Sequence, residues 1–197
     1  LFTGATGAAL LDESLPSFLR NQRWFAGKEQ GLATLAISDQ APLEDSGTSF
    51  LMTLVDVGLN DGEHQRYLLP LAVTWETDTD PAFDLLPYTV ARARRVHRVG
   101  VLHDALAESR FTAAVIQAMR EDRRIGTAEG GSVAFRPTRL LGDEPAVPAD
   151  EIHRLGREQS NTSMMIGDRM VLKVYRRLNE GVHPELEVGR FLPDVAG

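Results

Sequence analysis

The sequence predicts an α+β fold from three observations. An amphipathic helix near the start is followed by three strand-like stretches that short polar turns connect. A second amphipathic helix comes later, and the Pro-, Asp- and Glu-rich connection LGDEPAVPADE follows it, so we expect a subdomain boundary between about residues 126 and 150. A helix followed by consecutive strands with short links is typical of an antiparallel sheet packed on a helix.

The first helix is expected within DESLPSFLRNQRWFAGK, residues 12–28. Three apolar residues recur at helical spacing on one face: Leu15, Phe18 and Leu19. Asp12 or Ser14 is suited to cap the start of this helix, and Gly27 is expected to end it.

Three strands are expected at about residues 32–41, 49–58 and 66–75, because the stretches PLEDSG and LNDGEH between them have the composition of turns. The later stretch YTVARARRVHRVGVLHDAL, residues 88–106, is compatible with a strand or a helix. Gly100 is expected to interrupt it in either case.

The second helix is expected within ESRFTAAVIQAMREDRR, residues 108–124. Its apolar residues recur at helical spacing: Phe111, Val115, Ala118 and Met119. A loop with one short strand is expected over residues 126–140, before the Pro- and acid-rich connection.

Composition narrows the classes of partner and site. The chain has 197 residues and a formal net charge of −7, which argues against nucleic acid or an anionic membrane as the main partner. It has no cysteine, which excludes disulfides and thiolate chemistry and fits a reducing cytoplasm, the predicted location. The five histidines lack metal-ligand spacing, so no metal site is expected. A chain that opens on Leu1 is expected to come from a longer protein.

Two clusters of side chains are each open to two interpretations. An aromatic pair beside a helix, Trp24 and Phe25, favours burial in a core or docking contact, and stacking on a sugar is the alternative. A basic cluster favours a solvated face, paired with Asp104 or Glu108, over a phosphate or nucleic-acid site. The members of this cluster are Arg92, Arg94, Arg95, His97 and Arg98.

The stretch EQSNTSMMIGDRMVLKVYRRL, residues 158–178, combines parts that fit one mechanism. Backbone amides and hydroxyls of the loop Glu158–Ser163 are suited to hold phosphate oxygens. Beyond a tight turn at Gly167, Lys173 in the next strand has the charge and reach to contact the same phosphates. Glu187, in a following helix, is the expected ion-pair partner of this lysine. On the residues alone, an outward-facing lysine on a solvated strand remains the alternative.

The whole chain resembles the front half of the maltokinases, which have an aminoglycoside-phosphotransferase-like kinase fold. The resemblance rests on three segments: QRWFAGK, HDAL and, above all, EQSNTSMMIGDRMVLKVYRRLNEGVHPELEVGRFL. It implies an N-terminal cap subdomain of helix and curved antiparallel sheet over residues 1–125. The start of a protein-kinase-like N-lobe is implied over residues 126–197.

The resemblance also implies an activity for the full-length protein. ATP, assisted by Mg²⁺, would phosphorylate maltose at its anomeric hydroxyl and give maltose 1-phosphate, within trehalose and glycogen metabolism. The phosphate loop would then comprise Ser160, Asn161, Thr162 and Ser163. Lys173 would contact the phosphates and pair with Glu187, with Glu185 as the weaker candidate for that partner.

In this fold the catalytic base and the metal ligands lie beyond the position of Gly197, so no catalytic residue is assigned within the chain, and the chain alone is expected to be inactive. Two alternatives remain open. One is a non-catalytic module that docks on a trehalose synthase through QRWFAGK and an acidic surface, and a trehalose synthase is also expected as a possible fused neighbour. The other is a kinase of the same fold that acts on another sugar or an aminoglycoside.

Overall fold

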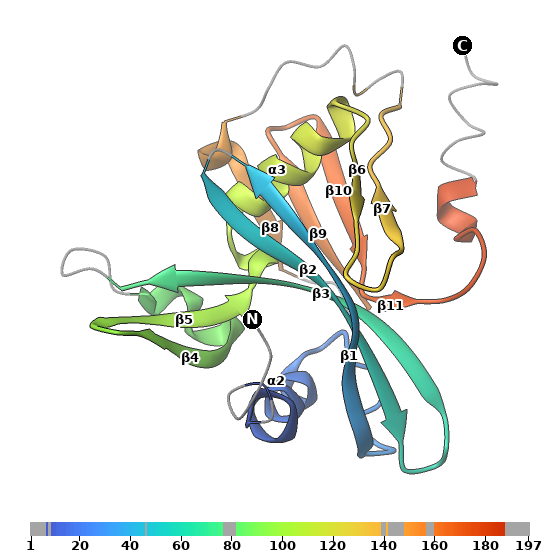
Figure 1. Cartoon of the computed structure of the whole chain (residues 1–197). Coiled ribbons are helices and arrows are strands. Elements are labelled where there is room, and N and C mark those ends of the chain that lie inside the picture. The colour runs from blue at the N-terminus through green and yellow to red at the C-terminus, as the bar shows by residue number, and fades with distance from the viewer. Residues whose placement is uncertain are drawn as a thin grey trace.

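The computed structural model describes residues 7, 9–45, 47–76, 82–138, 141, 148–156 and 160–187. The α+β prediction is confirmed for this part of the chain, in which short helices accompany sheets whose strand pairs are antiparallel (Figure 1).

A large twisted sheet forms the centre of the structure, with the strand order β1-β2-β3-β5-β4 (Figure 1). Strand β11 pairs with the first half of β3. Its strands are β1 (Leu32–Asp45), β2 (Thr48–Leu59), β3 (His64–Trp75), β4 (Thr89–Arg95), β5 (Arg98–Asp104) and β11 (Arg177–Leu178). The three strands predicted at the front of the chain are confirmed, and each extends beyond the predicted range because the turns between them are short.

The ambiguous stretch 88–106 forms the β4–β5 hairpin, and the expectation that Gly100 interrupts it is wrong. Gly100 lies within β5, opposite Trp75 of β3 and Ala93 of β4. A Cβ atom at this position would lie 2.4 Å from the backbone oxygen of Thr74. The glycine therefore permits close approach of two strands instead of breaking one.

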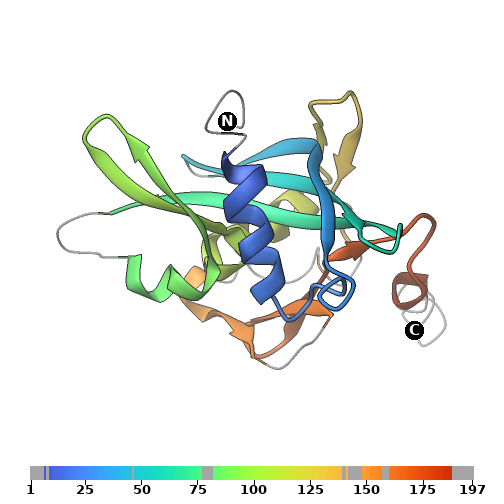
Figure 2. The ribbon, with the colours of Figure 1, turned by 90° about the horizontal axis from the view of Figure 1, so that it is seen from below.

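The first helical segment begins earlier and ends earlier than predicted. A π-helical turn η1 (Leu10–Ser14) leads into the α-helix α2 (Leu15–Asn21), so Ser14 has helical backbone angles and makes no side-chain capping bond. The helix ends at Asn21, before Gly27, and the aromatic pair lies in the turns that follow. Helix α2 lies across one face of the large sheet (Figure 2).

The predicted second helix is confirmed as α3 (Ser109–Arg120), which lies on the opposite face of the large sheet. Neighbouring residues of β3 mark the two faces, since Leu71 packs in the core beneath α2 and Ala72 packs in the core with α3. A second, three-stranded sheet with the order β10-β9-β8 packs on α3 (Figure 1). Its strands are β8 (Ile152–Leu155), β9 (Asn161–Ile166) and β10 (Met170–Tyr175).

Short elements connect these layers: the 3-10 turns η2 (Ala82–Tyr88), η3 (Ala105–Ala107) and η4 (Ala149–Glu151), and a hairpin of β6 (Arg124–Gly126) and β7 (Ser132–Ala134). The predicted division into residues 1–125 and 126–197 stays a prediction. The three-stranded sheet begins beyond that division, but β11 returns to pair with β3, so the two parts share the large sheet.

Candidate functional site

The three-stranded sheet presents one face to the core and one away from it. Side chains alternate along each strand, so directly paired residues share a face. Met164 and Leu172 are paired across β9 and β10 and belong to the core shared with α3. Ser163 and Lys173, the next pair along, therefore lie on the other face, which we call the lysine face. By pairing register it comprises His153, Leu155, Asn161, Ser163, Met165, Val171, Lys173 and Tyr175.

Lys173 is held by a glutamate, but the expected partner was wrong. Its Nζ atom lies 2.7 Å from Oε2 of Glu185, and the hydroxyl of Tyr175 donates to the same oxygen at 2.5 Å. Glu187 lies two positions further along a helical turn that starts at residue 184. Because two helical steps rotate a side chain by about 200°, Glu187 points away when Glu185 faces the strand.

Electrostatics agrees with this geometry. The hydrogen bond to Glu185 raises the pKa of Lys173, and the bonds from Lys173 and then Tyr175 lower the pKa of Glu185. The ring of His183 stacks on that of Tyr175 with centroids 3.9 Å apart, which fixes the start of the helical turn against β10. The lysine is therefore charged and restrained, while 35% of its side-chain surface stays open to solvent.

The predicted phosphate-loop residues do not all lie in a loop. Ser160 is an exposed bend, whereas Asn161, Thr162 and Ser163 form the start of β9. Residues 158 and 159 of the predicted loop lie outside the described residues. Thr162 faces the interior, where its hydroxyl accepts a hydrogen bond from Arg176 at 3.0 Å, so that hydroxyl is already committed. Ser163 Oγ is buried and has no hydrogen-bond partner among the described residues.

Arg176 forms a buried junction that sequence reasoning missed. Its guanidinium, with no solvent exposure, donates to both carboxylate oxygens of Asp104 and lies over the ring of Trp24, 4.9 Å from the centroid. Burial lowers the pKa of Arg176, and the carboxylate of Asp104 acts in the opposite direction. Nothing in the pattern YRRL distinguishes Arg176 from Arg177, whose side chain is 40% exposed. The motif HDAL carried the only hint, because it contains Asp104.

A second buried polar group lies beside this junction. Nδ1 of His103 lies 3.1 Å from the backbone oxygen of Asp104. Nε2 of the same ring lies 3.0 Å from Oε1 of Glu108, to which the hydroxyl of Thr74 donates at 2.5 Å. Burial raises the pKa of Glu108, but the hydrogen bonds from His103 and Thr74 together outweigh it and leave that pKa below its ordinary value.

The aromatic pair is buried, as predicted. Trp24 is 5% exposed and Phe25 is 3% exposed, which contradicts a sugar-stacking surface at these rings. Both pack on Tyr67 of β3, with ring centroids 5.6 Å and 5.4 Å from it. The hydroxyl of Tyr67 donates to Gln65 and accepts from the amide of Ala26, so the turn after α2 is tied to the sheet.

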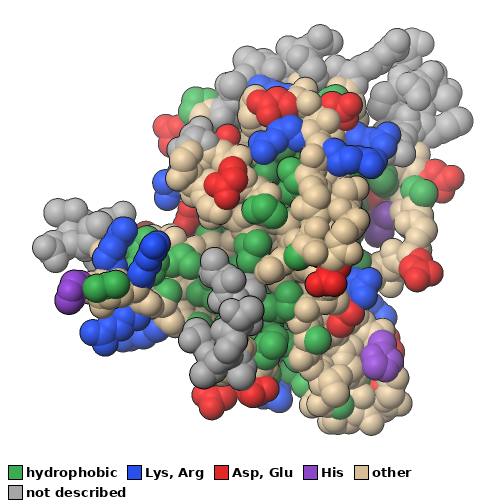
Figure 3. Space-filling model, viewed as in Figure 1, with side chains coloured by type: hydrophobic (Ala, Val, Ile, Leu, Met, Phe, Trp, Pro, Cys, Tyr) green, Lys and Arg blue, Asp and Glu red, His purple; other side chains and the backbone are tan. Residues whose placement is uncertain are grey.

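The basic cluster is a solvated surface, as predicted. Arg94, Arg95, His97 and Arg98 are exposed, and basic side chains gather over the β4–β5 hairpin (Figure 3). The expected pairing with Asp104 or Glu108 is wrong, because these carboxylates face Arg176 and His103. The guanidinium of Arg98 stacks on Trp75 instead, 5.2 Å from the ring centroid.

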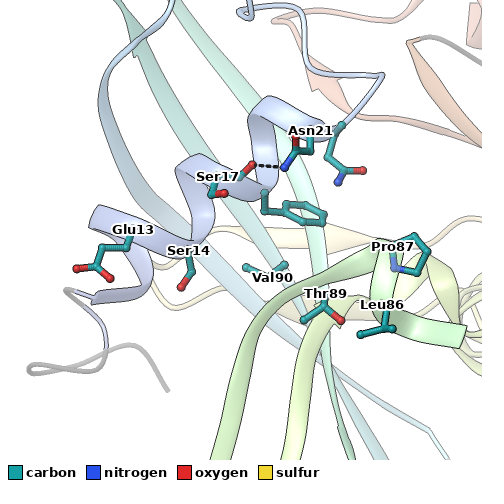
Figure 4. A pocket seen from close by; sticks show the side chains of 10 residues that line it. Glu13, Ser14, Ser17, Asn21, Leu86, Pro87, Thr89 and Val90 are labelled. Atoms are coloured by element: carbon teal, nitrogen blue, oxygen red, sulfur yellow. Dashed lines mark hydrogen bonds between the residues drawn. The ribbon is translucent and has the colours of Figure 1, made fainter. Parts of the chain in front are cut away.

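Two hollows lie in the part of the structure that contains the large sheet. A pocket of about 540 Å³ opens between α2 and the start of β4, where Asn21 Nδ2 donates to the backbone oxygen of Ser17 at 3.1 Å (Figure 4). A wider groove of about 1040 Å³ runs between the β4–β5 hairpin and the start of β2. Neither is lined by a residue of the lysine face, so they do not extend the candidate site.

Two classes of feature are not found in the described part of the chain. Its helices are too short to cross a membrane. The same residues contain no group of three or more His, Asp or Glu side chains placed to hold a metal ion.

A comparison with known protein families gives a match for the region that forms most of the large sheet. Residues 18–108 match a family model described as the maltokinase N-terminal cap domain. The matched stretch runs from within α2 to the residue before α3, and so includes Trp24 and Asp104 at the Arg176 junction. The lysine face lies beyond it. The resemblance to maltokinases is confirmed for this region, since residues 18–108 are similar to the maltokinase N-terminal cap domain.

Proposed function

We propose that the full-length protein is a maltokinase that transfers the γ-phosphate of ATP to the anomeric hydroxyl of maltose, giving maltose 1-phosphate for α-glucan metabolism. The match of residues 18–108 to the maltokinase cap domain supports a reaction of the maltokinase type. The single observation that supports ATP binding is Lys173, which is charged, lies on strand β10 and pairs with Glu185.

The lysine face fits an ATP phosphate group in three respects. Lys173 supplies a cation fixed by a strand and by Glu185, which suits a phosphate that must be held in line with its acceptor. Ser163, paired with it across the sheet, has a buried hydroxyl without a partner among the described residues. Leu155 and Val171 on the same face are 38% and 53% exposed, and these aliphatic surfaces are suited to contact a flat base.

In the described part of the chain, no three or more His, Asp or Glu side chains are placed together to hold a metal ion such as Mg²⁺. We therefore assign the Mg²⁺ ligands and the catalytic base to other residues of the full-length protein. The roles proposed here are phosphate binding by Lys173 and Ser163, with Ser160 and Asn161 beside them. Glu185 replaces Glu187 as the residue that orients the lysine.

The experiment is an assay of the full-length protein with ATP, Mg²⁺ and maltose, in which the product is identified by mass spectrometry and NMR. Maltose 1-phosphate, and no phosphorylated product from glucose, trehalose or an aminoglycoside, is the expected result. Phosphorylation of another acceptor in preference to maltose would assign a related kinase, and ATP hydrolysis without any acceptor product would reject the transfer reaction.

The docking-module alternative receives no support from QRWFAGK, because Trp24 and Phe25 are buried in the cap. Association with a trehalose synthase stays a prediction, because the described residues do not select a surface for it.

A further inference from the structure

We propose that Arg176 is a positioning residue, through which the cap domain sets the place of Lys173 in the nucleotide site. The inference rests on the proposed function for its catalytic consequence. Its structural part, a coupling between the cap and the lysine face, stands on the contacts of Arg176 alone.

Arg176 is the single residue between two sheets. Strand β10 ends at Tyr175 and belongs to the three-stranded sheet, whereas β11 begins at Arg177 and pairs with β3 of the cap. The backbone oxygen of Arg176 accepts a hydrogen bond from the amide of Leu68 at 2.7 Å. The chain therefore passes from the lysine-bearing strand into the cap sheet at this one residue.

The side chain ties together the same layers as the backbone. Asp104, at the end of β5, and Trp24, after α2, both belong to the cap, and Thr162 belongs to β9. A guanidinium is a rigid planar fork, so its two bonds to one carboxylate and its third to Thr162 admit a narrow range of positions. A shift of the cap relative to β9 would break at least one of these bonds within the protein interior.

The buried pair fixes a geometry more than it adds stability. Taking both charges out of water costs nearly as much as their attraction returns, so apolar residues of similar volume often stabilise a fold equally well. A fully buried Arg176–Asp104 pair is therefore better suited to set one alignment than to raise the melting temperature.

This alignment reaches the lysine through β10. Lys173 lies on β10, three residues before Arg176, which directly follows that strand, and its partner Ser163 is adjacent to Thr162 on β9. Both members of the lysine-face pair thus lie next to the Thr162–Val174 pair, whose threonine is bonded to the guanidinium. Since displacement of a catalytic group by about 1 Å can cost a hundredfold in rate, loss of this restraint should appear in turnover.

The test uses three variants of the full-length protein and one control. Arg176→Lys keeps the charge but loses the fork, and Asp104→Asn keeps the shape but loses the charge. The double variant Asp104→Leu/Arg176→Met replaces the pair with apolar side chains. The control is Arg177→Lys, which alters an exposed ion pair with Glu63, at 2.7 Å, one residue further along the chain.

Two readouts separate the inference from the proposed function. Hydrogen–deuterium exchange of residues 161–166 and 170–175 needs no activity, and faster exchange there is expected in the three variants but not in Arg177→Lys. In the kinase assay, kcat should fall by about tenfold to a hundredfold with little change in the KM for maltose. The double variant should recover the melting temperature but not kcat.

Several outcomes would overturn the proposal. Unchanged exchange in both segments would remove the coupling whether or not the protein phosphorylates maltose. Wild-type kcat in the double variant would show that the pair contributes only to folding. A wild-type protein without kinase activity would reject the proposed function, and the exchange experiment would still decide whether Arg176 couples the cap to the lysine face.

Discussion

Lys173 and Glu185 form an ion pair with 2.7 Å between Nζ and Oε2, and the hydroxyl of Tyr175 donates to the same carboxylate oxygen. The lysine comes from a strand and the glutamate from the first turn of a helix, so the pair joins two elements. Both groups are partly open to solvent, with side-chain exposures of 35% and 57%. An exposed pair of this kind stabilises a fold little, so its role is better explained by ligand binding than by stability.

Replacement of Lys173 by methionine should remove phosphate binding and leave folding intact. Removal of one charged contact to a developing phosphate is expected to lower kcat for maltose 1-phosphate formation by about a hundredfold or more. The packing of β10 is supplied by Leu172 and Val174, so thermal unfolding should be nearly unchanged. Lys28, the only other lysine and an exposed residue of the cap, provides the matched control Lys28→Met. Normal turnover in Lys173→Met would return the lysine to a solvated surface, and a collapse of its melting temperature would make it structural.

Substitutions of Glu185 and Glu187 should have different effects on kcat in the same assay. Glu185→Gln removes the charge that orients Lys173, and we expect a lower kcat, by about tenfold, because the lysine then samples several rotamers. Glu187→Gln is the control of identical chemistry two residues away, and we expect it to retain most activity. The reverse order would mean that the lysine changes partner when nucleotide binds, and would restore the partner first expected from the sequence.

Local patterns determined which parts of the fold were predictable. The strands at the front and α3 follow from periodicity and turn composition, and the burial of Trp24 and Phe25 follows from their size. The sequence did not distinguish the β4–β5 hairpin from a helix, because the turn of this hairpin consists of Val96 and His97 and lacks the usual Gly or Asn. Val96 adopts a positive φ of 55° in this turn. An arginine-rich strand also lacks the apolar alternation that would identify it.

The candidate site was predictable only as far as residue type. Lys173 on a strand and a nearby glutamate follow from the sequence, but the choice between Glu185 and Glu187 depends on how the helical turn docks on β10. The junction at Arg176 depends on Asp104, 72 positions earlier, and no local pattern reports such a contact. Burial of an arginine is a property of the assembled layers.

Replacement of Gly100 by alanine should destabilise the cap. The new Cβ atom would lie 2.4 Å from the backbone oxygen of Thr74 and 3.0 Å from Cα of Trp75, so backbone atoms of β3 must move. Strain of this kind typically costs about 1–3 kcal/mol in the free energy of unfolding. Gly126→Ala is the control, because no atom lies within 4 Å of a Cβ built there. Equal urea unfolding curves for the two variants would contradict the close approach of β3 and β5.

The half-buried carboxylate of Glu108 should make stability depend on pH in the acid range. Its pKa in the folded protein lies below the ordinary value of 4.5, although burial acts to raise it, because His103 and Thr74 hydrogen-bond to the charged form. A group with a lowered pKa contributes stability that is complete above its unfolded-state pKa and is lost as pH falls through its folded-state pKa.

Glu108→Gln tests this directly, because glutamine retains the shape and carries no charge. At pH 7 the variant should be less stable than the wild type by about 1.5–3 kcal/mol, the usual contribution of hydrogen bonds to a charged group. The difference should begin to shrink below about pH 4.5 and disappear once Glu108 is protonated in the folded protein. Glu29→Gln, at an exposed turn, serves as the control and should behave like the wild type. Melting temperatures measured between pH 3 and pH 7 decide the matter, and a constant difference across that range would show that the charge of Glu108 is not what stabilises the fold.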